Sequence, residues 1–238
     1  MLLSGVKVSI LKENGCHEKI VEWLEQCLRR SEDLDEMYPY WALWVAGNPD
    51  CAPDVLNVLA PHHDAEVRRA VGRNPRTSSD TLALLSFDSD ATSRQGVAAH
   101  RCTPATTLHM LSADRDPAVR VEVARNLATA AGTLAGLEFD AHWRVRLAVA
   151  DRKEATAAML SRLAADSEPA VRFTVARNPN TTENLLYMLA GDKNSLVRAG
   201  VAMNRASPDR LIRMLSRDQD PGVRQLTFGH PACALKRA

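Results

Sequence analysis

The sequence predicts an all-α solenoid, and three observations support that fold class: a repeat of 26 residues, pairs of leucines that recur with it, and a shortage of aromatic residues. A fixed period of about 20–50 residues is typical of stacked repeat proteins. Aromatic residues make up only 5% of the 238 residues, which disfavours a β-sandwich, because strands are enriched in aromatic and β-branched side chains. The aspartates that mark the period are Asp88, Asp114, Asp140, Asp166, Asp192 and Asp218.

Each unit opens with a helix that starts at a capping residue and carries a Val-Arg-like pair. In Asp116-Pro117-Ala118-Val119-Arg120 the aspartate suits the N-cap and the proline suits the first helical position. Val67, Val71 and Asn74 then fall on one face of the helix. An Asn-Pro pair ends the helix, because a residue before proline disfavours the α conformation.

The arginine of this pair recurs in every unit, seven times in all. In the fifth unit we expect Trp143-Arg144 to form the pair and Asp140 to be the N-cap, so that the loop before this helix is two residues short. Trp143 would then pack in the buried valine column. The pairs are Val67-Arg68, Ser93-Arg94, Val119-Arg120, Trp143-Arg144, Val171-Arg172, Val197-Arg198 and Val223-Arg224.

The second helix of each unit is brief, and at roughly eight to ten residues part of it is expected to be 3₁₀. Isolated helices shorter than about 12–15 residues are marginal in water, so the units must stack side by side and bury their valine and leucine columns. The sequence therefore predicts seven units and a truncated eighth over residues 37–238. The leucine columns are Leu56, Leu82, Leu108, Leu134, Leu160, Leu186 and Ile212, and Leu59, Leu85, Leu111, Leu137, Leu163, Leu189 and Leu215.

Residues 1–36 are predicted to form an N-terminal helical cap. Ile20, Leu24 and Leu28 form a helical stripe, and a solenoid needs a cap to cover the open end of its core. The first five residues lack a basic region, and no apolar run approaches the roughly 18–20 residues of a membrane span, so we expect neither a signal peptide nor membrane insertion. Five scattered cysteines argue against a disulfide framework and favour the cytoplasm.

The unit pattern D-x-x-V-R-x-x-V-A-x-N-P-x-T, followed by paired leucines, is clearest in residues 119–126 and 171–181. It resembles the leucine-rich repeat variant proteins of bacteria, relatives of HEAT and armadillo arrays, over about 200 of the 238 residues. The resemblance implies short α and 3₁₀ helices alternating in a right-handed α-solenoid. It implies little about function, because such scaffolds host many binding roles.

No cofactor and no metal site is expected. Some members of that family carry a [4Fe–4S] cluster on an N-terminal domain, but Cys16, Cys27 and Cys51 offer no C-x-x-C spacing and no fourth nearby thiol. Because such clusters are held by four cysteines, we expect no iron–sulfur cluster. The adjacent residues His62-His63 do not form a metal site with Cys51 either, since neighbouring side chains do not share a face.

Two sets of arginines differ in their expected roles. The arginine of the Val-Arg pair, with an aspartate four residues earlier, suits a structural ladder of ion pairs that joins adjacent units. Arg73, Arg125 and Arg177 instead precede the asparagine column at steps of 52 residues, and Arg69 lies nearby. By analogy with HEAT arrays their helices line the concave face, so these four residues are the candidate binding patch.

The asparagine column is expected to satisfy backbone groups where each first helix ends. His100 and His230 occupy the same column and are interpreted as replacements for asparagine. The asparagines of the column are Asn48, Asn74, Asn126, Asn178 and Asn204.

No catalytic motif is found in the sequence, so we expect a non-enzymatic scaffold for protein–protein interaction. Its curved, preformed surface would bind a protein, with an acidic segment favoured by a basic inner face. The alternative is a solenoid that binds nucleic-acid phosphates through the four candidate arginines. A HEAT-like alkylpurine DNA glycosylase is less favoured, because most units lack aromatic residues where they would line a groove.

Overall fold

The computed structural model describes residues 40–228, and every regular element in this range is an α-helix. The chain divides into two compact units, Met1–Ala130 (unit 1) and Ala131–Ala238 (unit 2). The predicted cap at residues 1–36 lies outside the described residues. Unit 1 contains α4 (Trp41–Gly47), α5 (Pro53–Leu59), α6 (Ala65–Arg73), α7 (Ser79–Leu85), α8 (Ala91–Ala99), α9 (Ala105–Leu111) and α10 (Pro117–Arg125). Unit 2 contains α11 (Ala131–Leu137), α12 (Trp143–Ala150), α13 (Ala157–Leu163), α14 (Pro169–Arg177), α15 (Glu183–Ala190), α16 (Ser195–Met203), α17 (Asp209–Leu215) and α18 (Pro221–Thr227).

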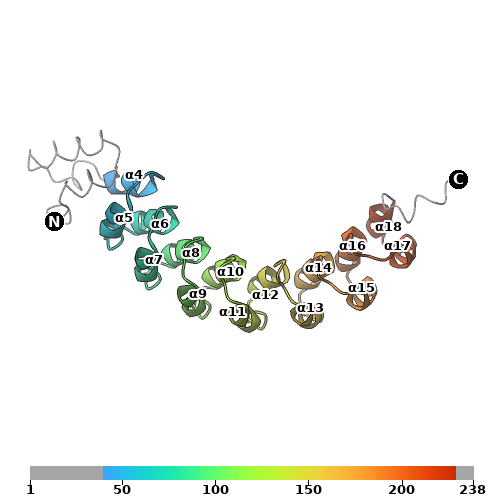
Figure 1. Cartoon of the computed structure of the whole chain (residues 1–238). Helices are drawn as coiled ribbons and strands as arrows, with labels where there is room; N and C mark the ends of the chain where they lie inside the picture. Colours follow the sequence, from blue (N-terminus) through green and yellow to red (C-terminus); the bar gives the residue numbers. More distant parts are fainter. Residues whose placement is uncertain (1–39, 229–238) are drawn as a thin grey trace, which may run out of the picture. The chain divides into compact units, whose positions relative to one another are not determined.

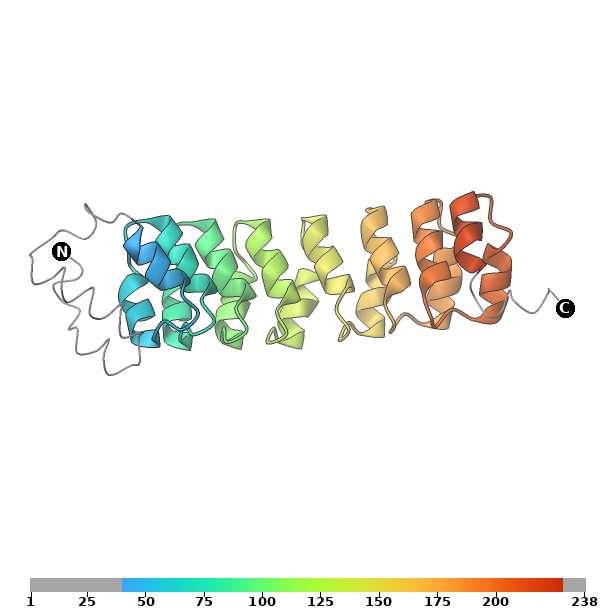
Figure 2. The ribbon, with the colours of Figure 1, turned by 90° about the horizontal axis from the view of Figure 1, so that it is seen from above.

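The helices alternate between two rows, which confirms the predicted all-α solenoid of paired helices. Within each unit the even-numbered helices lie in one row and the odd-numbered helices in a second (Figure 1). Figure 2 shows the helices of a row side by side. Neighbours in the even-numbered row pack extensively, whereas the odd-numbered helices mainly contact the even-numbered row. In each unit the even-numbered row lies on the inner side of the curve (Figure 1).

The valine and leucine columns form the core between the two rows, as the sequence predicts. Val119 and Val171 of the first helices are completely buried, and so are Leu108 and Leu186 of the second helices. Burying one such side chain stabilises the fold by about 1.5–3 kcal/mol. The buried columns therefore hold the even-numbered and the odd-numbered rows of helices together.

The second helices are α-helices, and the 3₁₀ geometry expected for them is not seen within residues 40–228. In α7, for example, the Leu82 N–H donates to the Ser78 carbonyl four residues earlier, at 2.9 Å. None of the described helices combines the length and the apolar character that crossing a membrane requires.

The fifth 26-residue repeat keeps the register of the others, so the expectation of a shortened loop before its first helix is wrong. Val145, not Trp143, occupies the valine column and is completely buried. Arg146, not Arg144, occupies the arginine column. The N-cap is His142 rather than Asp140, because the His142 ring accepts the Arg144 N–H at 3.3 Å. Trp143 is the first residue of α12 and is only half-buried.

The arginine column forms a ladder with the aspartates that mark the repeat. Arg94 donates from Nε and Nη2 to both carboxylate oxygens of Asp114, at 2.6 and 2.9 Å. Its Nη1 donates to the carbonyls of Asp88 and Ser89, at 2.7 and 3.1 Å. The ladder itself was predicted, but its partner is the aspartate 20 residues later rather than the one four residues earlier. The earlier aspartate, Asp90, instead caps α8. The equivalent pairs are Arg68–Asp88, Arg94–Asp114, Arg146–Asp166, Arg172–Asp192 and Arg198–Asp218.

Each ladder aspartate joins two repeats. The Asp114 carboxylate binds Arg94 and also accepts the Asp116 N–H at 2.9 Å, while the Asp114 carbonyl accepts Nη1 of Arg120 at 2.6 Å. The Arg94 and Asp114 side chains are 7% and 6% exposed. Burial alone raises the pKa of Asp114, but the hydrogen bonds from Arg94 and Asp116 outweigh it and bring the pKa below its ordinary value. The carboxylate is therefore ionised and fixed in place at neutral pH.

The asparagine column forms a second line of hydrogen bonds between repeats. Asn74 Nδ2 donates to the carbonyls of Ala46 and Asn48 in the preceding repeat, both at 2.7 Å. Its Oδ1 accepts the Arg76 N–H at 3.0 Å. The predicted role at the helix end is thus confirmed, and the same side chain also joins neighbouring repeats. Equivalent bonds are made by Asn126, Asn178 and Asn204.

His100 replaces asparagine in this column, as predicted. Its Nδ1 accepts the Cys102 N–H at 3.1 Å and its Nε2 contacts the Asn74 carbonyl at 2.9 Å. Because Nδ1 is the acceptor, the ring is neutral and Nε2 is the donor. Burial lowers the pKa of His100 below its ordinary value. His230 lies outside the described residues.

Replacing Asp114 with alanine should destabilise unit 1 by about 3–5 kcal/mol, because the buried Arg94 guanidinium loses its carboxylate. Urea denaturation followed by circular dichroism measures the effect. Asp80→Ala is the matched control: Asp80 is exposed in the first turn of α7 and its loss should cost less than about 1 kcal/mol. Equal destabilisation by the two substitutions would contradict the structural role of the ladder.

His100→Asn should preserve stability near neutral pH and reduce the sensitivity of the fold to acid. The pKa of His100 is lower in the folded chain than in the unfolded chain, where it is about 6.5. Stabilisation by the neutral ring is therefore complete above that pH and lost below it, by up to about 1.4 kcal/mol per pH unit. Urea midpoints at pH values of about 7.5, 6 and 5 measure the difference.

His109→Asn is the control for this substitution, because it removes a histidine from the exposed side of α9. It makes the same chemical change as His100→Asn, at a surface position outside the asparagine column. The assignment of His100 as a neutral, hydrogen-bonded replacement for asparagine fails if His100→Asn and wild type lose stability in parallel as the pH falls.

Candidate functional site

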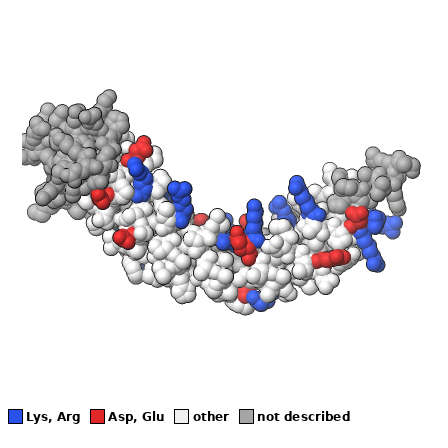
Figure 3. All heavy atoms as spheres, viewed as in Figure 1, with Lys and Arg blue, Asp and Glu red and all other residues white. Residues whose placement is uncertain are grey.

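The candidate surface is the exposed stripe, defined as the side chains of the even-numbered helices that face away from the odd-numbered row. In α14 the stripe consists of Ala170, Phe173 and Arg177, which are exposed or half-buried. Val171 and Val175 on the opposite face are completely buried. In each unit, basic side chains project from the side of the even-numbered row (Figure 3). The four predicted arginines all lie on these helices.

Arg69 is bound to carboxylates of its own unit. Its Nε and Nη2 donate to both oxygens of Asp90, at 2.9 and 3.0 Å, and its Nη1 donates to Glu66. The hydrogen bond to Asp90 raises the pKa of Arg69, and the same bond lowers the pKa of Asp90. Arg69 is therefore held and neutralised, which makes it a poor ligand for a further anion.

The other three predicted arginines lie at the C-terminal ends of their helices. Arg125 is exposed and pairs with Glu122 at 3.2 Å. Arg177 lies over the Phe173 ring, with its guanidinium carbon 5.7 Å from the ring centre. Arg73 is exposed, and its side-chain stem packs close to α8. Three of the four predicted arginines therefore lie in unit 1, where Arg69 and Arg125 are paired with acids. The fourth, Arg177, lies in unit 2.

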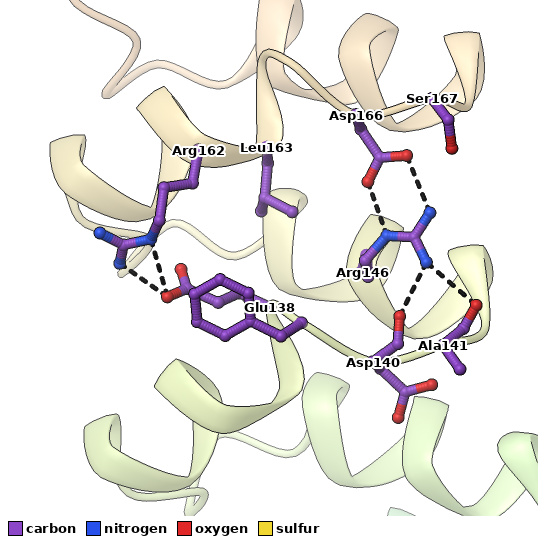
Figure 4. Close-up of a pocket in the computed structure, with 9 residues that line it drawn as sticks. Glu138, Asp140, Ala141, Arg146, Arg162, Leu163, Asp166 and Ser167 are labelled. Atoms are coloured by element: carbon purple, nitrogen blue, oxygen red, sulfur yellow. Dashed lines mark hydrogen bonds and ion pairs between the residues drawn. The ribbon is translucent and has the colours of Figure 1, made fainter.

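An open hollow in unit 1 and one in unit 2 lie at equivalent places of the repeats. The hollow in unit 2 has a volume of about 460 Å³ and is lined by Glu138, Phe139, Arg146, Arg162 and Asp166, among others (Figure 4). Its ladder arginine is bonded to the ladder aspartate and to two loop carbonyls. The hollow in unit 1, of about 560 Å³, is lined by residues at the same repeat positions three repeats earlier. The hollows are therefore a product of the repeat geometry.

Glu138 distinguishes the hollow in unit 2. Its side chain is 2% exposed, and its Oε1 accepts Nε of Arg162 at 2.9 Å and Nη2 at 2.6 Å. Arg162 also lies over the Phe139 ring, 5.8 Å from the ring centre. Arg162 pairs with Glu138 and Arg146 pairs with Asp166, while the second carboxylate oxygen of Glu138 is buried without a hydrogen-bond partner among the described residues. The lining residues include no histidine or cysteine. The arrangement is that of a structural ion pair.

Within residues 40–228 no group of three or more histidine, cysteine or acidic side chains is placed to hold a metal ion. The His62 and His63 rings stack on each other with centres 4.3 Å apart. Cys51 is a buried free thiol, and Cys102 is an exposed one.

Sequence reasoning missed residues of the stripe in unit 2, among them Arg144, Leu196 and Met203. Arg144, which was assigned to the ladder, is exposed and lies over the Trp143 ring, 4.7 Å from the ring centre. Leu196 and Met203 on α16 are 66% and 46% exposed. Counting whole repeats forward from Arg144 and Arg177 reaches these two positions, so the period alone could have found them.

Comparisons with known proteins agree with this repeat structure. A family model described as "Leucine rich repeat variant" matches residues 65–90. Fourteen chains of solved structures also match. One of them, "a leucine-rich repeat variant with a novel repetitive protein structural motif", is 28% identical with a TM-score of 0.60, and the match covers 82% of each chain. No curated protein matches the sequence.

Replacing Gly200 with alanine should destabilise unit 2 by about 1–3 kcal/mol. A Cβ at this position would lie 3.0 Å from the Ala176 side chain, 3.0 Å from the Phe173 ring and 3.1 Å from the Phe173 carbonyl. Gly136→Ala is the matched control, because a Cβ there meets nothing within 4 Å and should be neutral or slightly stabilising. Urea denaturation of both variants tests the close packing of α16 on α14, which an equal response would refute.

Proposed function

We propose that this chain, whose repeats are similar to leucine-rich repeat variant repeats, is a non-catalytic scaffold that binds another protein along the exposed stripe. The composition of the stripe carries this proposal, since it presents large apolar side chains beside arginines. Leu196 is 66% exposed near the start of α16 and Met203 is 46% exposed at its end, and Arg177 is exposed at the end of α14 in the preceding repeat. Exposed apolar side chains accompanied by arginine are typical of the centres of protein–protein interfaces.

The helices that present the stripe are fixed before any partner binds. Within a unit, each even-numbered helix is joined to its neighbours by ladder and asparagine-column bonds and by its buried valines. A surface held in this way loses little conformational entropy on binding, so more of the contact energy appears as affinity. This is the mechanism by which repeat scaffolds bind extended partners.

The bonding of the arginines favours a protein partner over nucleic acid. Arg172 of the ladder gives two N–H bonds to Asp192 and two to loop carbonyls, so its donors are used inside the fold. Arg69 and Arg125 of the stripe bind acids of their own unit. Non-specific binding to nucleic acid depends on many arginines and lysines at phosphates, and this surface offers few.

The electrostatics of the described residues support a non-catalytic role. A general acid that acts at neutral pH needs a raised pKa, whereas the hydrogen bonds of the ladder lower the pKa of Asp114, Asp192 and Asp218 against the opposing effect of burial. Both ring nitrogens of His100 are bonded inside the fold.

We further propose a cytoplasmic location, which the free thiols Cys51 and Cys102 suit.

The proposal is tested by capturing proteins from a lysate of the source cells on immobilised full-length chain. Wild type is compared with Leu196→Asp on the stripe and with Met214→Asp, an exposed apolar position on α17 in the odd-numbered row. Wild type and Met214→Asp should retain the same partner. Leu196→Asp should bind the purified partner about tenfold more weakly. Loss of the partner from both variants, or from neither, would contradict binding along the stripe.

A parallel titration tests the competing function. Fluorescence anisotropy of labelled single-stranded and duplex DNA and RNA is measured at about 50 and 200 mM salt, with no binding expected at the lower salt. Micromolar binding that falls about 10³-fold at the higher salt would replace the proposed function with nucleic-acid binding.

A further inference from the structure

The stripe differs between the two units in how its arginines are paired. In unit 1 two of the three stripe arginines, Arg69 and Arg125, are neutralised by acids of the same unit, and the third, Arg73, is exposed with neither a carboxylate nor an aromatic ring paired with it among residues 40–228. The pairs are Arg69–Glu66, Arg69–Asp90 and Arg125–Glu122. In unit 2 the stripe arginines are Arg144 and Arg177, and within residues 40–228 neither has a carboxylate partner. Unit 2 therefore keeps positive charge available on its stripe.

Both arginines in unit 2 are supported by aromatic rings. Arg144 lies 4.7 Å from the centre of the Trp143 ring, and Arg177 lies 5.7 Å from the centre of the Phe173 ring. A cation over the face of an aromatic ring is attracted by the ring's quadrupole. Within residues 40–228 neither guanidinium is paired with a carboxylate, so its N–H donors stay available to a carboxylate of a partner while the ring limits the motion of the side chain.

Further basic residues follow the C-terminal ends of the same helices. Lys153, Arg177 and Arg205 are exposed and come from three successive repeats, at or just after the ends of α12, α14 and α16. Cations are electrostatically favoured at helix C-termini. In the loop after α12, Glu154 pairs with Arg152 of the same loop, and Asp151 is exposed. The C-terminal ends of α12, α14 and α16 therefore each carry an exposed basic residue.

Apolar side chains lie between the charged positions. Phe173 packs on Gly200, where a Cβ would come within 3.0 Å of its ring. Leu196 and Met203 stand at the two ends of the same helix, separated by the small residues Ala199 and Gly200. The stripe of unit 2 thus has exposed apolar side chains at both ends of α16 and small, buried residues between them.

We infer that the stripe of unit 2 (Arg144, Phe173, Arg177, Leu196 and Met203) binds an acidic peptide segment of a partner protein whose carboxylates alternate with large apolar side chains. Arg144 and Arg177 bind carboxylates of the segment, and Leu196 and Met203 contact its apolar side chains. The inference rests on the proposed function and deepens it by assigning the half of the chain that binds and the chemistry of the partner. Arg144 and Arg177 lie over one face of the Trp143 and Phe173 rings, and those ring faces are then not free to stack on nucleic-acid bases.

The probe for the inference is a displayed library of random 12-residue peptides, selected on immobilised full-length chain. The enriched peptides should combine Asp or Glu with Leu, Ile, Phe or Met. One labelled peptide is then titrated by fluorescence anisotropy. Arg144→Ala and Arg177→Ala should each weaken its binding about fivefold, and Leu196→Asp should weaken it about tenfold or more.

Two substitutions on α17 serve as matched controls in the same unit. Arg213→Ala and Met214→Asp change an exposed arginine and an exposed apolar residue of the odd-numbered row, and each should leave the affinity within about twofold, as is usual outside an interface. Circular dichroism of every variant verifies that it folds. Replacing the acids of the peptide with Asn or Gln should weaken binding to wild type and have a smaller effect on Arg144→Ala and Arg177→Ala.

The outcomes separate this inference from the proposed function. Enriched peptides without acidic residues would overturn the inference, and so would binding that Leu196→Asp leaves unchanged. If binding is instead lost in Arg73→Ala of unit 1, the scaffold function stands and the assignment to unit 2 is wrong. If no peptide is enriched and the lysate yields no partner, both the inference and the proposed function fail.

Discussion

The position of the ladder aspartate is the constraint on which the rest of the structure depends. Asp114 accepts two bonds from Arg94 of the preceding repeat and one from its own loop, and its carbonyl accepts Arg120 of its own repeat. An aspartate side chain is short, so these groups meet only if the two arginines and the loop keep a fixed spacing along the chain. The 26-residue period of the aspartates is the record of that geometry in the sequence.

The ladder acts on register more than on net stability. Most of the stabilisation comes from the buried valine and leucine columns, but these columns are nearly alike in every repeat and specify the offset between neighbours only weakly. A buried ion pair returns much of its Coulombic energy as desolvation cost, yet its demands on distance and angle are strict. The pairs from Arg68–Asp88 to Arg198–Asp218 therefore select one offset, and the asparagine column enforces it where the first helices end.

The sequence predicted the paired helices, both leucine columns, the asparagine column and the replacement at His100, because each depends on periodicity or local capping. The prediction failed in the fifth repeat. There Trp143-Arg144 was matched to the Val-Arg pair by residue type, although counting one period of 26 residues from Val119 leads to Val145. It also could not identify the ladder partner, since that aspartate lies 20 residues away beyond the next helix. The different states of Arg69 and Arg177 could not be predicted either. Arg69 is neutralised by Asp90 of the following repeat, whereas Arg177 lies over the Phe173 ring, and such contacts appear only once the chain is folded.

The frame and the binding surface use different atoms, which explains how similar repeats can carry different surfaces. The ladder and the asparagine column take many of their acceptors from backbone carbonyls, and their side chains come from columns that point away from the stripe. The fold therefore places few demands on the identity of a stripe residue, apart from close approaches such as that of Gly200 to Phe173. One stripe position accordingly carries Arg69, Gln95, Val121, Leu147, Phe173 and Ala199 in successive repeats. Since the buried columns recur and this position does not, the chemistry that distinguishes one unit from the other resides in the stripe.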